Sequence, residues 1–282
     1  MQFDSLESTH DIDMFLGLPK SGKTTIAGTY PKPLLYISVG QDGGGVVLKN
    51  IPGIKAKILK NDPKVNGKIA KCSIEYLAEI LSELRQSKDP ELQFKTLVVD
   101  TIGALQDDCQ AMLVANKGGK SLSDNEWGEI SKMLQNIKES MKRFSEEKKC
   151  KIVWIDHVKD MEMYETSGLL KEIRLIPTLT KKTGAKWLKD ARNIFYVCRK
   201  TFVDSTGEKI VKFATYIGPH PLVDTGTREL TLSHGDFVLD FTYDKWCKMK
   251  ELGKLIDVAT PVLITDTKEE KDDDDNNDNK GE

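Results

Sequence analysis

Long apolar runs are missing from the sequence: none approaches the length of about 20 residues that a membrane-spanning helix requires. The first residues, 1–13, are polar and acidic, whereas a secretory signal begins with a basic stretch followed by an apolar core. Both absences argue against a membrane partner and against secretion. We therefore expect a protein of the cytoplasm.

Cysteines are also few, and they form neither a C-x-x-C pair nor a Cys/His pairing. Their scatter argues against a zinc site, and an odd number of them favours a reducing compartment over a disulfide framework. Most of them stand in or beside apolar segments, where cysteine behaves as a small core residue. They are Cys72, Cys109, Cys150, Cys198 and Cys247.

Charge of one sign is concentrated near the end of the chain. Residues 266–282 contain nine acidic residues and three lysines, whereas the rest of the chain carries a small positive net charge. A segment made mostly of Asp, Asn, Lys and Glu cannot bury enough apolar surface to fold. The sequence therefore predicts one folded domain over residues 1–264 and an acidic disordered tail over residues 265–282. The tail either occludes a basic groove, recruits a partner or simply keeps the chain soluble.

Short apolar segments alternate with amphipathic ones along the folded domain. A continuous apolar run such as residues 34–39 (LLYISV) is typical of a strand covered on both faces. Strands that alternate with helices form a mainly parallel sheet covered by helices, so the expected fold class is α/β. A hairpin is predicted over residues 202–216, and a polar loop before residue 173. The other predicted strands are 11–16, 96–99, 151–155 and 193–198, and the predicted helices are 22–30, 73–85, 105–113, one capped by Ser123 or Asp124, 181–192 and 244–255.

Residues 17–24 (GLPKSGKT) match the phosphate-binding pattern G-x-x-x-x-G-K-[ST] between an apolar strand and a helix. The glycines let the backbone curl around a phosphate, and the following helix directs its N-terminus at the same anion. Lys23 is expected to reach the β- and γ-phosphates, and the Thr24 hydroxyl to coordinate Mg²⁺. The pattern therefore predicts a P-loop that binds ATP with Mg²⁺. The predicted nucleotide-binding residues are Gly17, Leu18, Pro19, Lys20, Ser21, Gly22, Lys23, Thr24 and Thr25.

A second acidic site is predicted at Asp100, which follows the apolar run 97–99. An apolar strand that ends in aspartate is the Walker B pattern, in which the carboxylate holds Mg²⁺. Many strands end in aspartate, but the P-loop upstream favours this interpretation. Thr24 and Asp100 are therefore the predicted metal-binding residues, and Asp100 and Lys23 are predicted to act in catalysis.

Three segments resemble RecA-type recombinases, and more closely phage-encoded RecA-like ATPases of the single-strand annealing and recombination type. They are FLGLPKSGKTTIAGTYPKPLLYI (15–37), TLVVDTIGALQDD (96–108) and KIVWIDHVK (151–159). The resemblance covers residues 11–198 and extends more loosely to about residue 221. It implies a RecA-like P-loop NTPase core with a C-terminal β-hairpin extension. It also implies an ATPase that acts on single-stranded DNA, as a homo-oligomer with nucleotide near the subunit interface, in the host cytoplasm if a phage encodes it.

The resemblance also assigns catalytic roles by position. His157, beside Asp156, would sense the γ-phosphate at the end of its strand; the alternative is a histidine whose hydrogen bonds are satisfied at a strand end. The catalytic glutamate of RecA-type enzymes falls on Gly40 here, with Asp42 near enough to substitute. The basic residues that such enzymes supply across the subunit interface are represented only by Lys212. These departures predict slow hydrolysis by the protein alone.

Two further segments, 117–123 and 158–186, fall where RecA-type proteins place their DNA-contacting loops. Their basic side chains would meet phosphates, with Tyr164 and Trp187 as candidate partners for stacked bases. Interspersed acidic residues dilute the charge, so a solvated charged face is an equal alternative. The predicted DNA contacts are Lys117, Lys120, Lys159, Lys171, Lys181, Lys182 and Lys186, with Arg174 among them.

Two other functions fit a P-loop. One is a nucleotide-gated assembly or regulatory protein with little catalysis, which the missing glutamate favours. The other is a small-molecule kinase, but such enzymes close an arginine-rich lid over the phosphates, and the arginines here are scattered. Stimulation of hydrolysis by DNA distinguishes the recombination-type ATPase from both.

Overall fold

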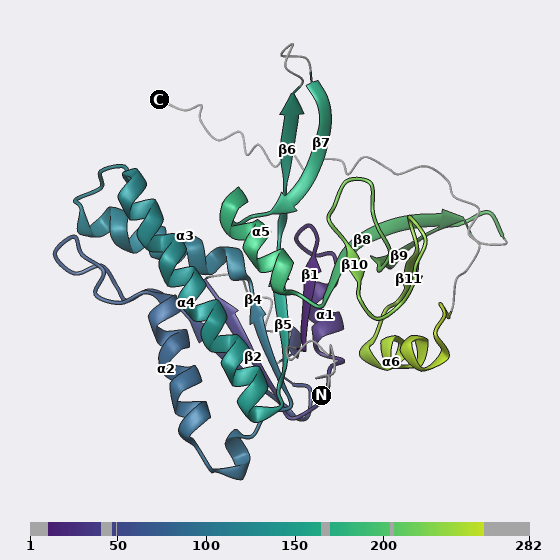
Figure 1. Cartoon of the computed structure of the whole chain (residues 1–282), viewed down its shortest axis with the longest axis horizontal. Helices are drawn as coiled ribbons and strands as arrows, with labels where there is room; N and C mark the ends of the chain where they lie inside the picture. Colours follow the sequence, from purple (N-terminus) through teal and green to yellow (C-terminus); the bar gives the residue numbers. More distant parts are fainter. Residues whose placement is uncertain (1–10, 41–46, 49, 165–169, 204–205, 257–282) are drawn as a thin grey trace, which may run out of the picture.

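The structure is a computed structural model that describes residues 11–40, 47, 48, 50–164, 170–203 and 206–256. Within these residues nine strands form one sheet in the order β11-β9-β8-β1-β5-β4-β2-β3, with β10 paired to β8. The predicted catalytic residue Asp42 and the acidic tail lie outside the described residues. Figure 1 shows the sheet with helices packed over it. The strands of the sheet are β1 (Ile12–Leu16), β2 (Leu34–Val39), β3 (Ile54–Leu59), β4 (Thr96–Asp100), β5 (Lys151–Asp156), β8 (Asn193–Val203), β9 (Lys209–Tyr216), β10 (Gly226–Thr227) and β11 (Phe237–Leu239).

The centre of the sheet is parallel, from β8 through β1, β5, β4 and β2 to β3. Strands β9, β10 and β11 join at one side in antiparallel orientation. The predicted α/β class, with a mainly parallel sheet and a hairpin extension, is therefore confirmed. The helices are α1 (Lys23–Ala27), α2 (Ser73–Gln86), α3 (Ile102–Asn116), α4 (Asp124–Lys148), α5 (Lys181–Asp190) and α6 (Tyr243–Leu252).

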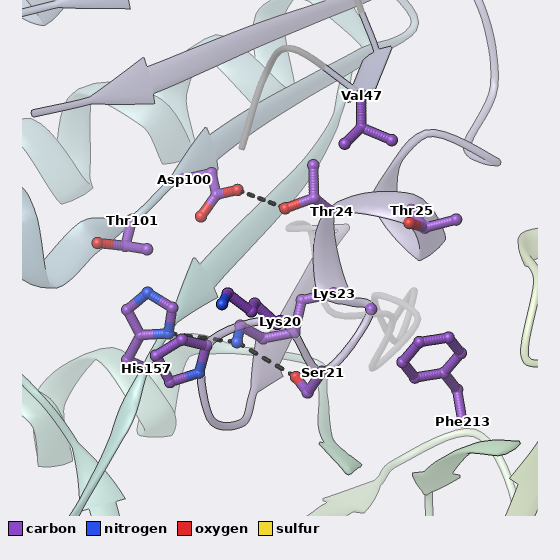
Figure 2. Close-up of a pocket in the computed structure, with 12 residues that line it drawn as sticks. Lys20, Ser21, Lys23, Thr24, Thr25, Val47, Asp100, Thr101, His157 and Phe213 are labelled. Carbon is purple, nitrogen blue, oxygen red and sulfur yellow. Dashed lines mark hydrogen bonds between the residues drawn. The ribbon is translucent and has the colours of Figure 1, made fainter. Parts of the chain in front are cut away.

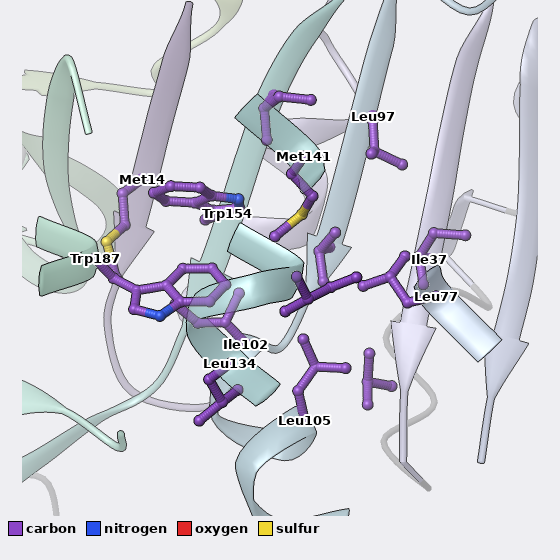
Figure 3. Close-up of a cluster of buried hydrophobic side chains, with 14 of the residues drawn as sticks. Met14, Ile37, Leu77, Leu97, Ile102, Leu105, Leu134, Met141, Trp154 and Trp187 are labelled. Carbon is purple, nitrogen blue, oxygen red and sulfur yellow. The ribbon is translucent and has the colours of Figure 1, made fainter. Parts of the chain in front are cut away.

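Side chains of the central strands divide between two hydrophobic cores because successive residues of a strand point to opposite faces. On β1, Met14 joins the core under α2, α3, α4 and α5, whereas Phe15 joins the core under α1 and α6. On β5, Trp154 packs at 4.6 Å between ring centroids against Trp187 of α5. Figure 3 shows this first core, with both tryptophans among the aliphatic side chains. The strands are thus covered on both faces, as their apolar runs predict.

Trp187 has no exposed surface. The prediction that it stacks on bases is therefore wrong, because its helix turns the ring into the core. The basic helical stretch itself does form, as α5, and its exposed lysines lie on the opposite side from the tryptophan. None of the described helices combines the length and the apolar character that crossing a membrane would require.

The predicted polar loop before residue 173 is instead a hairpin of β6 (Val158–Tyr164) and β7 (Leu170–Pro177). It forms a separate two-stranded sheet that projects beyond the main sheet (Figure 1). Most of its side chains keep some exposure on both faces, so it lacks the apolar alternation by which a half-buried strand is recognised. The edge strand β3 was missed for the same reason, since its middle residues are exposed.

Helix α1 is shorter than the predicted 22–30. It ends at Ala27, and the backbone N–H and the hydroxyl of Thr29 both donate to the carbonyl of Ile26. Such a local side-chain bond competes with continued helix. Tyr30 is then buried, and its hydroxyl donates to Asp13 of β1 at 2.7 Å. The turn thus fastens the end of α1 to the strand that precedes the P-loop.

Candidate nucleotide-binding site

The P-loop lies at the carboxyl end of β1, the edge at which parallel sheets bind ligands. Its first glycine, Gly17, lies so close to strand β8 that a Cβ atom there would come within 2.2 Å of the Val197 carbonyl oxygen. Gly22 has a φ of 96°, and a Cβ atom there would lie 3.1 Å from the ring of Phe213. The two glycines therefore let the loop pack directly against the β8–β9 hairpin.

Lys23 begins α1, and its ammonium points back into the P-loop. It donates hydrogen bonds of 2.7 Å to the carbonyls of Gly17 and Leu18, and one of 3.3 Å to the Ser21 hydroxyl. Burial lowers the pKa of the Lys23 ammonium to about 8, although the negative charges of Asp100 and Asp156 oppose that shift. The ammonium is thus partly desolvated and aimed at the concave side of the loop.

Thr24 and Asp100 meet in the same pocket as this ammonium, as Figure 2 shows. The Thr24 hydroxyl donates a hydrogen bond of 2.8 Å to Oδ2 of Asp100 at the end of β4. The same carboxylate oxygen accepts a hydrogen bond from the hydroxyl of Tyr36, a buried side chain on the neighbouring strand β2. Tyr36 therefore fixes the Asp100 carboxylate toward Thr24. A hydroxyl and a carboxylate are the hard oxygen donors that Mg²⁺ prefers, so this pair fits that ion.

His157 stands between the P-loop and Asp100 because β5 separates β1 from β4 in the sheet. Its Nδ1 atom lies 3.3 Å from the Lys23 ammonium and 3.4 Å from the Gly17 carbonyl oxygen. Its predicted position at the ligand edge of the sheet thus matches the structure. The sensing role itself stays a prediction.

Asp156, just before His157, is fully buried and joins three segments. Its Oδ1 atom accepts hydrogen bonds from the backbone N–H of Gly103 at 3.1 Å and from the Thr178 hydroxyl at 2.7 Å. Burial raises the pKa of this carboxyl to about 6, although those hydrogen bonds oppose the shift. Gly103 lies in the first turn of α3, and Thr178 directly follows the β6–β7 hairpin. The start of α3 and the root of that hairpin are therefore fastened at one point beneath the site.

The P-loop, Asp100 and His157 line a pocket of about 620 Å³. Its walls contain most of the predicted nucleotide-binding residues, together with Asp100 and His157 from the neighbouring strands. Thr101, Val47 and Phe213 complete the lining and had not been predicted. Phe213 lies on a hairpin strand whose sequence carries no phosphate-binding signal. The lining residues are Pro19, Lys20, Ser21, Gly22, Lys23, Thr24, Thr25, Val47, Asp100, Thr101, His157 and Phe213.

Gly40, which takes the place of the expected catalytic glutamate, stands at the end of β2. It has a φ of 80°, and a Cβ atom there would lie 3.8 Å from the Cβ atom of Ala104 in the first turn of α3. The position therefore faces the same edge of the sheet as Asp100. Asp42, the predicted substitute base, follows just outside the described residues.

The predicted DNA-contacting residues fall on three separate elements. Lys117 and Lys120 follow α3, where Lys117 forms an ion pair of 2.7 Å with Glu126 of α4. Lys159 and Lys171 lie on the β6–β7 hairpin, and Lys159 donates to the Thr178 carbonyl at 2.7 Å. Figure 1 shows α5 immediately below this hairpin. The exposed lysines of α5 are the predicted Lys181, Lys182 and Lys186, together with Lys189.

A phosphate-binding loop between β1 and α1, at the carboxyl edge of a mainly parallel sheet, defines the class of P-loop nucleotide-binding proteins. More specifically, the chain belongs to the AAA domain family, whose model matches residues 14–229, more than half of its length. The domain is thus of the nucleotide-binding ATPase type, and binding of this kind usually depends on Mg²⁺. A comparison with curated proteins finds no match.

Proposed function

We propose that this protein is an ATPase that binds MgATP in the P-loop pocket and acts on single-stranded DNA in recombination or annealing. The observation that carries the nucleotide half of the proposal is the convergence of Lys23, Thr24, Asp100 and His157 in one pocket. Their donors and acceptors suit a triphosphate with its magnesium ion. The family match independently supports a nucleotide-binding ATPase.

Each group has a role that follows from its place. Lys23 would exchange its bonds to the P-loop carbonyls for bonds to the β- and γ-phosphates. Thr24 would hold Mg²⁺ directly and Asp100 would hold it through water, and the ion would neutralise charge that develops on the phosphates. His157 is placed to contact the γ-phosphate, since it lies beside Lys23. Asp42 is the candidate base that would orient the attacking water.

The DNA half of the proposal rests on the hairpin and on α5. Thr178, at the root of the β6–β7 hairpin, donates its backbone N–H to the carbonyl of His157 at 3.0 Å. His157, the proposed γ-phosphate contact, directly precedes β6 in the chain and is hydrogen-bonded to the residue that follows β7. It is therefore joined at both strands to the hairpin that carries Lys159 and Lys171. A change at the phosphate would reach that surface through a single residue. We propose that the protein assembles into a homo-oligomer on the DNA, with nucleotide near the subunit interface.

Hydrolysis by the protein alone is expected to be slow because Gly40 replaces the glutamate that would activate water. The decisive measurement is the ATPase rate with and without single-stranded DNA, for the wild type and for Lys23→Ala. Lys248→Ala, which removes an exposed lysine from α6, is the control for loss of positive charge. The proposal expects a DNA-stimulated rate that only Lys23→Ala abolishes. A fast rate without DNA would contradict the expected slow turnover.

A second candidate function is a nucleotide-gated assembly or regulatory protein with little catalysis. Gly40 at the end of β2 is the observation that favours it. A rate near zero with and without DNA, combined with ATP binding that Lys23→Ala weakens, would support this function and contradict the first.

A further inference from the structure

The pocket has two chemically different ends. Asp100 and His157 lie at one end, beside the Lys23 ammonium. Figure 2 shows Phe213 on the other side of the P-loop, whereas Val47 stands above Thr24, away from Phe213. Both side chains remain accessible, with exposed fractions of 41% for Phe213 and 64% for Val47. A solvent-accessible aromatic ring therefore flanks a loop whose own residues suit phosphate.

The β8–β9 hairpin holds Phe213 in this position. Phe213 pairs with Arg199 of β8 in the strand register, and the Arg199 guanidinium lies 5.9 Å from the centre of the phenyl ring. Arg199 also donates a hydrogen bond of 2.9 Å to the carbonyl of Lys20 in the P-loop. The ring itself is packed against Gly22. Strand pairing, a cation–π contact and a hydrogen bond to the loop thus orient the ring before any ligand arrives.

This geometry bears on where the nucleotide's base lies. Contacts from Lys23 and Thr24 would fix the β- and γ-phosphates, and the polar end of the pocket would be taken by the γ-phosphate and Mg²⁺. The rest of the nucleotide must then leave toward Thr25 and Phe213. Bases stack favourably on aromatic side chains, and partial exposure of the ring leaves a face open for stacking.

We propose that Phe213 is the platform on which the nucleobase stacks. This inference rests on the proposed function, because the P-loop must first hold the phosphates. It makes Phe213 a residue that raises the affinity for nucleotides above the affinity for phosphates that carry no base. Arg199 is its positioning residue, since it fastens the ring and the P-loop to each other.

The test separates the base from the phosphates by comparing ATP with inorganic tripolyphosphate, which has no base. Binding of each, with Mg²⁺, is measured calorimetrically for the wild type, Phe213→Ala and Phe213→Trp. Val211→Ala is the matched control, because Val211 lies two residues away on the same face of β9, is 63% exposed and does not line the pocket.

We expect Phe213→Ala to weaken ATP binding on the order of tenfold and to leave tripolyphosphate binding unchanged. Phe213→Trp keeps an aromatic face and should retain ATP affinity, and Val211→Ala should bind both ligands as the wild type does. Equal losses for ATP and tripolyphosphate would overturn the inference, since Phe213 would then only support the P-loop. Unchanged ATP binding by Phe213→Ala would overturn it as well. Failure of the wild type to bind either ligand would instead overturn the proposed function, and the base subsite with it.

Discussion

The Thr24 hydroxyl donates a hydrogen bond of 2.8 Å to the Asp100 carboxylate, although the two residues stand 76 positions apart in the chain. One stands in the first turn of the helix after the P-loop, and the other ends β4. The sheet brings them together because β1 and β4 run parallel and flank β5 on its two sides. The hydroxyl and the carboxylate that are expected to hold Mg²⁺ therefore lie next to each other in the nucleotide pocket.

The first prediction concerns Mg²⁺. Thr24→Ala removes the hydroxyl that is expected to bind the ion, so Mg²⁺ should no longer strengthen ATP binding, with a loss on the order of 10- to 100-fold in Mg²⁺ affinity. Thr24→Ser keeps the hydroxyl and is the control. The measurement is the dissociation constant of ATP with and without Mg²⁺. Full Mg²⁺ dependence in Thr24→Ala would exclude Thr24 as a ligand.

The second prediction concerns the pH dependence of nucleotide binding. Burial lowers the pKa of Lys23 to about 8, whereas Asp100 and Asp156 favour its charged form. The charged ammonium attracts phosphate, so affinity should be present below this pKa and lost above it. ATP binding is expected to weaken about tenfold between pH 7 and pH 9.

The control for this prediction is Lys23→Ala, whose weaker residual affinity should hardly change over the same range. A wild-type affinity that stays constant to pH 9 would show that Lys23 keeps its proton or does not contact the phosphates.

The third prediction concerns the close approach beneath the site. A Cβ atom on Gly103 would lie 2.0 Å from the Thr178 hydroxyl oxygen and 2.7 Å from Oδ1 of Asp156. Gly103→Ala should therefore lower the free energy of unfolding by about 1–3 kcal/mol, as overpacking does. Gly128→Ala in helix α4 is the matched control, because a Cβ atom there meets nothing within 4 Å. That substitution should be neutral or stabilising by up to about 1 kcal/mol.

Removing the Thr178 side chain tests the cause of that loss. The double variant Gly103→Ala with Thr178→Ala should be more stable than the sum of the two single effects predicts, because the closer of the two clashes is gone. Additive losses in urea denaturation would contradict this explanation.

The fourth prediction concerns Asp156 and stability. Burial raises the pKa of its carboxyl from 3.8 to about 6 in the folded protein. A raised pKa stabilises the fold below the pKa of the unfolded chain, and this contribution disappears as the pH rises through about 6. Relative to Asp156→Asn, the wild type should therefore lose about 2 kcal/mol of unfolding free energy between pH 4.5 and pH 7.5. Urea denaturation of both proteins measures the difference, and a constant difference would contradict the raised pKa.

Much of the fold could be predicted because its strands are buried on both faces. Runs such as residues 34–37 and 152–155 are apolar along their whole length, and the amphipathic stripe of α4 is regular. The β6–β7 hairpin could not be found this way, since its side chains contact solvent on both faces. Its sequence therefore needs no alternation of apolar and polar residues. The position of Trp187 was misjudged for a related reason: a basic helix also has an inner face, which the charge count does not reveal.

The candidate site likewise contains residues that a local sequence pattern marks and a residue that only the fold brings into place. The P-loop and Asp100 could be predicted because short patterns of backbone and charge requirements mark them, and the place of His157 followed from its strand. Phe213 could not, because its position depends on how the β8–β9 hairpin folds back over Gly22. A contact between a loop near the start of the chain and a hairpin near its end leaves no local signal in either segment.

The place of β1 in the sheet also has a consequence for how the protein is made. Residues Ile12–Leu16 are synthesised well before their partners β5 and β8. Gly17 packs against the Val197 carbonyl of β8, and Gly22 packs against the ring of Phe213 on β9. Since domains generally fold as units once their contacts exist, the P-loop cannot take its final shape until translation has passed β9. A nascent chain that stops before Tyr216 should therefore carry the complete phosphate-binding motif and still fail to retain nucleotide.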